Sequence, residues 1–393
     1  MAKLKIRESY SGTPSGKYVV DKAENKVKKL EDHVSLRATT SLIALMKSVF
    51  LPQGYPYTVT DDYVTYQIWD TIQAFASSIT GALATEAVLK GVGVGSEKAS
   101  ILAATITWLL KDGVGMLGRI LFAWFKGTRL DIDCKKWRLM ADIFNDLAFL
   151  IDLLAPAAAD WFICFAITSS VLRSFVGVAG GATRAAIIQH QARRHNLADV
   201  AAKDGSQETL VNLTALLTSL VLLPAVHGKF VLVWICFFVF TALHLFANYK
   251  AVRSLNFDIL NERTLALSVR QFVNTDSVPT TAEANYQEPL FGSITGPRHF
   301  GCTLVKTFPV STSSDTHFIR YEKSTDEGWL AIRTSTSASE QIRYVFDLEY
   351  FALRNRLPTE KDYMSFEQMM KTSGWRFDVD HLGFDEWRFS ADE

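Results

Sequence analysis

The residues best placed to do chemistry are charged side chains inside otherwise apolar stretches of the sequence. They are Lys111, Asp112, Arg119, Asp142 and Asp146. Asp112 and Arg119 are seven residues apart, so they share one face of a predicted helix, with Gly115 between them. Asp142 and Asp146 are spaced i,i+4 on the next predicted helix and also share a face. We expect a charge network that handles a substrate or a proton. The alternative is a set of ion pairs that only fixes helix packing.

A second group of residues has the composition of an anion or phosphate site. It consists of Arg184, His190, Arg193 and Arg194. The pair Gly180-Gly181 just before them favours a helix break, and Thr183 is suited to cap a new helix. Arg side chains close to a helix N-terminus bind phosphate through charge-assisted hydrogen bonds. The alternative is that these charges only set the topology of a membrane protein.

Signatures of an enzyme or of a metal site are missing from the sequence. We find no Ser-His-Asp arrangement, HExxH motif, P-loop or nucleophile elbow. His227 and His244 lie 17 residues apart with no carboxylate or cysteine beside them, and the 4 cysteines are widely spaced. Gly91–Gly95 lies between two predicted helices, which argues against a dinucleotide site. We therefore expect no catalytic residues, no metal and no cofactor.

Overall composition excludes two further classes of protein. The 393 residues contain 41 Lys+Arg and 41 Asp+Glu, a net charge of +0, whereas a nucleic-acid-binding protein normally shows a basic excess. Hydrophobic residues make up 48% and charged residues 21%, so the chain has ample apolar surface to bury and is not disordered.

The apolar stretches that must position the charged residues are long enough to cross a bilayer, which takes about 20 mostly apolar residues. Thr209–Val226 has no charged residue, and Phe230–Tyr249 has only His244. Four weaker stretches precede them: Ile68–Leu89, Ala99–Phe125, Leu139–Leu154 and Trp161–Val178. The predicted fold class is mainly α, a multi-span helical membrane bundle of about six helices. Leu139–Leu154 is short, so it alternatively lies at the interface or packs inside the bundle.

Charge placement predicts the orientation of these helices. Lys and Arg residues concentrate in Lys126–Arg138 and His190–Asp204, which six spans would place on the same side as the N-terminus. We therefore expect an integral membrane protein with both termini cytosolic. The first 20 residues lack the apolar core of a secretory signal, so insertion is expected to depend on the internal spans.

Composition also predicts four regions along the chain. Residues 1–40 form a polar N-terminal arm that we expect to be loosely ordered, and 41–265 form the helical membrane domain. Residues 266–299 are rich in Pro, Thr, Ser and Gly and are expected to form a linker. Residues 300–393 have the pattern of a small α+β domain, with a hairpin of Phe318–Glu322 and Trp329–Thr334 followed by an amphipathic helix, Glu340–Asn355.

Several long stretches of the helical region resemble one known family. They include DYVTYQIWDTIQAFASSITGALAT at Asp62–Thr85, TWLLKDGVGMLGRILFAWFKGTRLD at Thr107–Asp131 and HQARRHNLADVAAKDGSQETLVNL at His190–Leu213. The chain is similar to the Root UVB Sensitive (RUS) family, whose shared region is also called the vitamin B6 photo-protection and homoeostasis domain. The resemblance runs from about Phe50 to Arg263 without a large gap.

This resemblance implies a membrane-associated protein linked to vitamin B6 homeostasis and the UV-B response, without established catalytic residues. It also implies assembly with another family member, as a homo- or hetero-oligomer. A vitamin B6 phosphate is then the natural ligand for the Arg184 group. Two functions remain open. One is a small-solute carrier in the lipid bilayer, which buried charges and glycine-interrupted helices favour. The other is a membrane adaptor that recruits a cytosolic partner or another family member.

Overall fold

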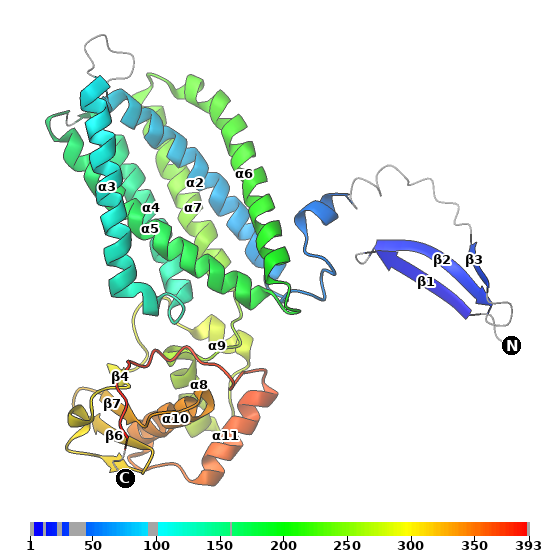
Figure 1. The fold of residues 1–393 in the computed structure, drawn as a ribbon, viewed down its shortest axis with the longest axis vertical. Coiled ribbons are helices and arrows are strands. Elements are labelled where there is room, and N and C mark those ends of the chain that lie inside the picture. The colour runs from blue at the N-terminus through cyan, green and yellow to red at the C-terminus, as the bar shows by residue number, and fades with distance from the viewer. Residues whose placement is uncertain are drawn as a thin grey trace. The chain divides into compact units, whose positions relative to one another are not determined.

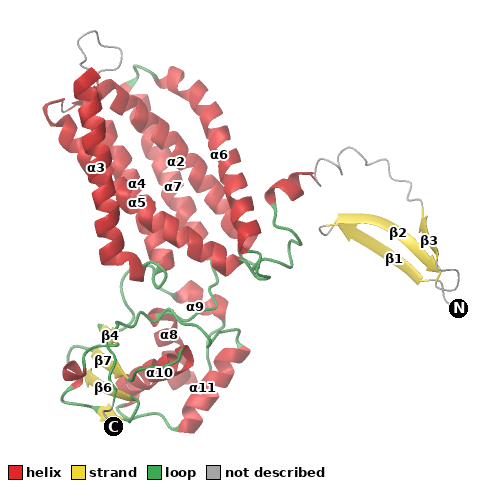
Figure 2. Ribbon diagram, viewed as in Figure 1, coloured by secondary structure: helices red, strands yellow, loops and turns green. Residues whose placement is uncertain are grey.

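The computed structural model describes residues 4–10, 13–21, 26–30, 45–92, 101–157 and 159–390, and it is mainly helical (Figures 1 and 2). Six long helices account for most of the first two thirds of the chain. They are α2 (Tyr63–Val92), α3 (Ile101–Lys126), α4 (Cys134–Leu154), α5 (Phe162–Gln191), α6 (Leu197–Val226) and α7 (Phe230–Ser254).

Two compact units make up the chain, and each is described by itself. The helical unit comprises Met1–Lys111, Asn145–Ser170 and Arg184–Ala251. The C-terminal unit comprises Asp112–Phe144, Val171–Thr183 and Val252–Glu393.

Four helices in the described part of the chain are long and apolar enough to cross a membrane: Tyr63–Gly91, Phe162–Gln191, Leu197–Val226 and Phe230–Ser254. The helices α3 and α4 form as expected but are not among these four. Helix α4 has 21 residues and carries Asp142, Asp146 and Asp152, so it is the least apolar of the six predicted spans. The structure therefore supports four candidate spans, and the expected bundle of six is not established.

Two helix boundaries differ from the sequence expectation. Helix α5 continues for 30 residues through Gly180-Gly181, and the Thr183 hydroxyl donates to the Ala179 carbonyl within it at 2.7 Å, so no new helix begins there. Helix α6 begins at Leu197, well before the apolar run that starts at Thr209. A helix-interior glycine costs only about 1 kcal/mol relative to alanine, which packing readily offsets. The loop expected at Gly91–Gly95 falls largely outside the described residues.

The described residues of the N-terminal segment 1–40 form an antiparallel sheet instead of a loosely ordered arm. Its strands are β1 (Leu4–Tyr10), β2 (Thr13–Asp21) and β3 (Lys26–Leu30), in that spatial order. Alternating apolar and basic residues such as those in LKIR of β1 suit a strand, because successive side chains point to opposite faces. The overall polar composition of the segment does not reveal this alternation.

The C-terminal unit contains a four-stranded sheet and four shorter helices. The spatial order is β4-β7-β6-β5, with β4 parallel to β7 and the other pairs antiparallel. The strands are β4 (Arg298–Phe300), β5 (Thr312–Ser313), β6 (His317–Glu322) and β7 (Glu327–Ile332). The helices are α8 (Glu262–Thr275), α9 (Thr281–Gln287), α10 (Ala338–Arg354) and α11 (Glu360–Thr372). The expected hairpin and amphipathic helix correspond to β6–β7 and α10.

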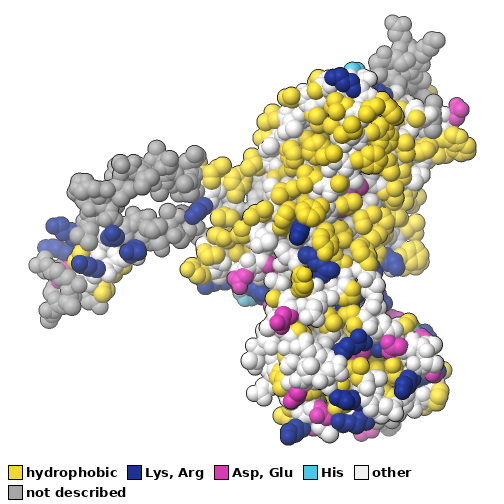
Figure 3. Space-filling model, turned by 180° about the vertical axis from the view of Figure 1, so that it is seen from behind, with side chains coloured by type: hydrophobic (Ala, Val, Ile, Leu, Met, Phe, Trp, Pro, Cys, Tyr) yellow, Lys and Arg dark blue, Asp and Glu magenta, His cyan; other side chains and the backbone are white. Residues whose placement is uncertain are grey.

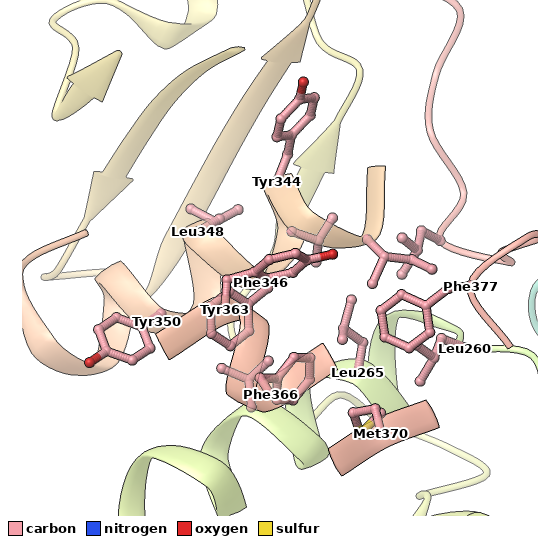
Figure 4. Packing of buried hydrophobic residues seen from close by; sticks show 14 of the residues in the cluster. Leu260, Leu265, Tyr344, Phe346, Leu348, Tyr350, Tyr363, Phe366, Met370 and Phe377 are labelled. Carbon is pink, nitrogen blue, oxygen red and sulfur yellow. The ribbon is translucent and has the colours of Figure 1, made fainter. Parts of the chain in front are cut away.

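One hydrophobic core joins these elements. Phe346 of α10 stacks on Phe366 of α11 with ring centroids 4.6 Å apart (Figure 4). Phe272 of α8 contacts both rings. Leu330 of β7 is fully buried in the same cluster. Segment 266–299 is therefore not a linker, because most of α8 and all of α9 lie in it and α8 supplies core side chains. The proline and threonine content reflects the turns and caps that begin and end these helices.

Candidate functional site

One face of α2 is polar although most of it is buried. Its residues recur every three or four positions, which places them on one side of the helix. They are Asp62 just before the helix, then Tyr66, Asp70, Gln73, Ser77 and Thr80. Asp62, Tyr66, Gln73 and Thr80 are buried, and Asp70 and Ser77 are half-buried. Since buried polar groups need partners, this face must meet polar residues of other helices.

The centre of this polar face holds a three-residue chain that we call the His244 cluster: Gln73 of α2, His244 of α7 and Asp146 of α4. Nε2 of His244 lies 2.9 Å from Nε2 of Gln73, and its Nδ1 lies 2.8 Å from both carboxylate oxygens of Asp146. His244 is fully buried and its two partners are buried as well. The arrangement fits the tautomer with hydrogen on Nδ1, which donates to Asp146 while Nε2 accepts from the Gln73 amide.

Further polar contacts extend from α2 to its neighbours in the helical unit. Asn145 Nδ2 of α4 donates to Ser77 Oγ at 3.0 Å. On an adjacent face of α2, the Ser78 hydroxyl donates to Asn212 Oδ1 of α6 at 3.0 Å. The helices α2 and α6 pack along each other (Figure 1). Within the helical unit, α2 is therefore the element that brings polar groups of α4, α6 and α7 together.

At the start of α2 lies a second buried histidine–carboxylate pair. His190 Nε2 is 2.9 Å from Asp62 Oδ2, and both side chains are almost completely buried. The Thr60 hydroxyl also donates to Asp62. The backbone holds this corner in place, because the Thr60 amide donates to the Gln191 carbonyl at 3.2 Å.

The expected phosphate site is not assembled by the residues proposed for it. Arg184 Nε lies 2.7 Å from Asp204, and its Nη1 lies 2.6 Å from Glu208. Gln67 Nε2 donates to the other Asp204 oxygen at 3.1 Å. The reason is the early start of α6, which places both acids on helix turns that face Arg184. His190 pairs with Asp62, so two members of the group are already bound to carboxylates. The other two, Arg193 and Arg194, are exposed.

The expected charge network also differs from what forms. Asp112 and Arg119 lie on α3 with exposed side chains, and neither makes an ion pair with any described residue. Lys111 on the same helix is half-buried, with Nζ 4.5 Å from the centre of the Trp108 ring. Asp142 is buried on α4. Asp146 is the one member found in the His244 cluster, and its partner there is 98 residues away.

The sequence analysis does not predict the role of His244, because no carboxylate lies near it along the chain. The spacing of polar residues on α7 nevertheless indicates that His244 lies on a polar face. Thr241, His244 and Asn248 recur at three and four residues on α7, so an otherwise apolar helix has one polar face. Two such faces on different helices are expected to meet, although the sequence does not specify which ones.

Comparisons with known proteins place this chain in a family. The model of the vitamin B6 photo-protection and homoeostasis domain matches residues 36–276, which include all of α2 to α8. The chain belongs to this family. Both histidine–carboxylate pairs lie within the matched range. The family's name ties the domain to vitamin B6 homoeostasis, and its plant members are named for root sensitivity to UV-B.

Three curated relatives illustrate the similarity. RUS family member 1 of Dictyostelium discoideum is 45% identical over 250 residues, covering 63% of this chain and 47% of the relative. Protein root UVB sensitive 3 of Arabidopsis thaliana is 41% identical over 239 residues, covering 61% and 54%. Protein root UVB sensitive 2, chloroplastic, of the same plant is 29% identical over 245 residues, covering 61% and 55%. The chain thus spans about half the length of these relatives. No solved structure matches it.

Proposed function

We propose that this protein is an integral membrane carrier of a small polar solute, with vitamin B6 compounds as the class of cargo and the His244 cluster as its central site. The observation that carries the proposal is the burial of Gln73, His244 and Asp146 between apolar helices. A charged side chain at the centre of a bilayer costs about 2.5–3.5 kcal/mol on insertion scales, so one that is present usually serves a substrate or ion pathway.

Exposed apolar side chains support the membrane part of the proposal. On α6 they include Leu213, Leu216, Leu217, Leu220 and Val221, and on α7 Phe230, Val231, Ile235, Phe238 and Val239. Figure 3 shows hydrophobic side chains gathered in a continuous field over the long helices. An exposed apolar surface of this extent on a single chain indicates a membrane or a large partner, and α6 and α7 also have the length of spans.

Four spans, like six, place both ends of the helical region on the same side of the membrane. This parity agrees with the cytosolic location expected for both termini from the basic loops. The family name supports the vitamin B6 assignment, so the test below compares three vitamers.

Uptake by proteoliposomes tests the carrier. The full chain is reconstituted, and entry of radiolabelled pyridoxine, pyridoxal and pyridoxamine is measured against protein-free liposomes. We expect uptake of at least one vitamer by the native protein and loss of that uptake in Asp146→Asn. The matched control is Asp112→Asn, the same chemical change at an exposed position of α3, which should transport normally. Uptake by none of the three, or normal uptake by Asp146→Asn, contradicts the proposal.

A membrane adaptor is the second candidate, supported by the C-terminal region. Residues beyond 276 lie outside the family match yet form most of a well-packed α+β core. An adaptor would recruit a cytosolic protein or another family member through this region while the helices anchor it. Deletion of 300–390 should then abolish rescue of a cell line that lacks the protein, whereas Asp146→Asn should rescue it fully. The carrier predicts the opposite result for Asp146→Asn.

A further inference from the structure

We propose that the His244 cluster is a proton-binding site and that solute movement through this protein is coupled to a proton. The inference rests on the proposed carrier function and adds the coupling ion to it. Its first support is that both ring nitrogens of His244 have partners that suit two protonation states.

The neutral and the protonated imidazole can each make every hydrogen bond in this cluster. In the neutral ring, Nδ1–H donates to Asp146 and Nε2 accepts from the amide nitrogen of Gln73. In the imidazolium both nitrogens donate, and rotation of the Gln73 amide presents its oxygen to Nε2 instead. A glutamine can make this exchange because its amide carries a donor and an acceptor. A backbone carbonyl or a second carboxylate would favour only the charged ring.

Charge supplies the second argument. With neutral His244 the cluster carries the single negative charge of Asp146, and with imidazolium it is a neutral ion pair. A bound proton therefore removes a net charge from an apolar interior, where net charge is most costly. A proton taken up at Nε2 from water on one side and released to water on the other returns the cluster to its starting state.

The polar face of α2 provides a route from this site to the end of the helix. Tyr66 donates to Asp70 at 3.3 Å, and Asp70 lies one turn before Gln73. At the start of the helix, the Asp62–His190 pair repeats the same chemistry. Asp62 and Gln73 are 11 positions apart, about 16 Å along a helix axis. Polar groups at every turn between them can move a proton in short steps with intervening water.

Few other charged groups lie on the elements around His244. On α2 the titratable residues of the same face are Tyr66 and Asp70, and on α4 in the helical unit they are Asp146 and Asp152. Helix α6 has no charged residue between Glu208 and its end at Val226. On α7 itself the nearest cation, Lys250, is exposed. Carboxylates therefore predominate among the charged groups on these elements.

The test measures solute and proton together in proteoliposomes of the full chain. The internal lumen holds a pH-sensitive dye, and radiolabelled pyridoxine, pyridoxal and pyridoxamine are supplied outside, with and without an imposed pH gradient. We expect the gradient to drive accumulation of the transported vitamer above equilibrium, together with a matching dye signal. His244→Gln should abolish both effects of the gradient, because glutamine keeps hydrogen bonding but cannot take up the proton. The matched control is His227→Gln, at an exposed turn, which should behave as the native protein.

The outcomes separate the two proposals. Uptake at the same rate and extent with and without the gradient overturns proton coupling and leaves the carrier intact. Absence of uptake for every vitamer counts against the carrier. Proton binding is then decided by nitrogen NMR of histidine-labelled protein, with His244→Gln identifying the signal. A His244 resonance that titrates between about pH 5 and pH 8 supports the site, and one that keeps a single form across that range overturns it.

Discussion

In the helical unit the large side chains of α6 and α7 are exposed and apolar, while Gln73, His244 and Asp146 occupy the interior. In residues 252–390 of the C-terminal unit the arrangement is reversed, with Leu330, Phe346 and Phe366 inside. Its surface in Figure 3 is a mixture of charged and other polar side chains. The proposed membrane location of the helices accounts for this difference, because a membrane favours apolar side chains on the outside of a helical bundle. Whether a side chain is expected to be buried or exposed therefore depends on the solvent that surrounds its part of the chain.

Both units bury a histidine beside an aspartate, but the distance between the two side chains differs. His244 is 2.8 Å from Asp146, whereas His317 Nε2 is 3.5 Å from Asp347 Oδ2. In the C-terminal unit, burial lowers the pKa of His317 to about 4 and raises the pKa of Asp347 to about 7. Ser314 Oγ lies 2.9 Å from Nδ1, the remaining nitrogen of His317. A hydroxyl can donate to this nitrogen or accept from it, so the lowered pKa of His317 comes from burial and not from this contact.

The largest expected effect separates a core aromatic residue from an exposed one. Phe346 is 0% exposed and Phe238 on α7 is 58% exposed. Phe346→Ala should lower the free energy of unfolding by about 3–5 kcal/mol, because it removes a ring from a packed core. Phe238→Ala should cost far less in detergent. Thermal unfolding of both variants in the same micelles checks the contrast. Equal losses would mean that Phe238 is covered in the native assembly.

The next effect tests the solvent of each unit directly. Val221 on α6 is 74% exposed and Val305 in the C-terminal unit is 82% exposed. A lysine at the centre of a membrane span costs about 2.5–3.5 kcal/mol on insertion scales, so Val221→Lys should sharply reduce membrane-integrated protein. Val305→Lys should not, since its side chain already faces water. The measurement is the carbonate-resistant fraction after membrane extraction. Normal integration of Val221→Lys would break the comparison between the units.

A smaller effect concerns pH in the C-terminal unit. The pKa of Asp347 is raised, so its contribution to stability is present at low pH and is lost as the pH rises toward about 7. The pKa of His317 is lowered to about 4, so stability is lost as the pH falls from the ordinary histidine range toward that value. The two trends oppose each other in the native protein.

Single substitutions should expose each trend. Asp347→Asn leaves the histidine, so stability of the full chain should rise with pH between about 4 and 6.5. His317→Gln leaves the aspartate, so stability should fall as the pH rises through the same range and on to about 7. Hydrogen exchange of β6 and β7 at several pH values measures this. Slopes of the same sign in the two variants would refute the assignment.

The smallest effect concerns helix caps. Helices α8 to α11 each begin with a capping box, whereas the residues before α5 and α6 make no side-chain cap. A helix in water depends on such caps more than one held by neighbouring apolar helices. Ser337→Ala at the start of α10 should cost about 1 kcal/mol. Urea unfolding followed at the C-terminal unit detects it, with the exposed Ser324→Ala as control.

Much of the helical organisation could be predicted from sequence. The apolar runs Thr209–Val226 and Phe230–Tyr249 lie within α6 and α7, and the β6–β7 hairpin and α10 were expected where they occur. These features depend on hydropathy and periodicity over 6 to 30 neighbouring residues, which local sequence contains. The α8 and α9 helices were missed because their polar and proline-rich flanks resemble a linker.

The candidate site was predictable only in part. Asp146 was expected in a charge network with Asp112 and Arg119 of α3, and in the structure it lies beside His244 of α7. Arg184 was expected to receive phosphate and instead receives Asp204 and Glu208. Each error concerns which helix lies opposite a residue. A residue's own helix determines the face it lies on, and nothing in that pattern specifies the neighbour's rotation or register.

By itself, then, the sequence determined the family, the apolar helices and the presence of charges that an apolar interior tolerates only in pairs. Tertiary structure decided that Asp146 meets His244 and Gln73, that Asp62 meets His190, and that segment 266–299 belongs to a packed core. The physical reason is the distance along the chain over which each kind of interaction acts. Hydropathy and helix periodicity act along the chain, whereas hydrogen bonds between helices depend on rotations and offsets fixed by the packing of all of them together.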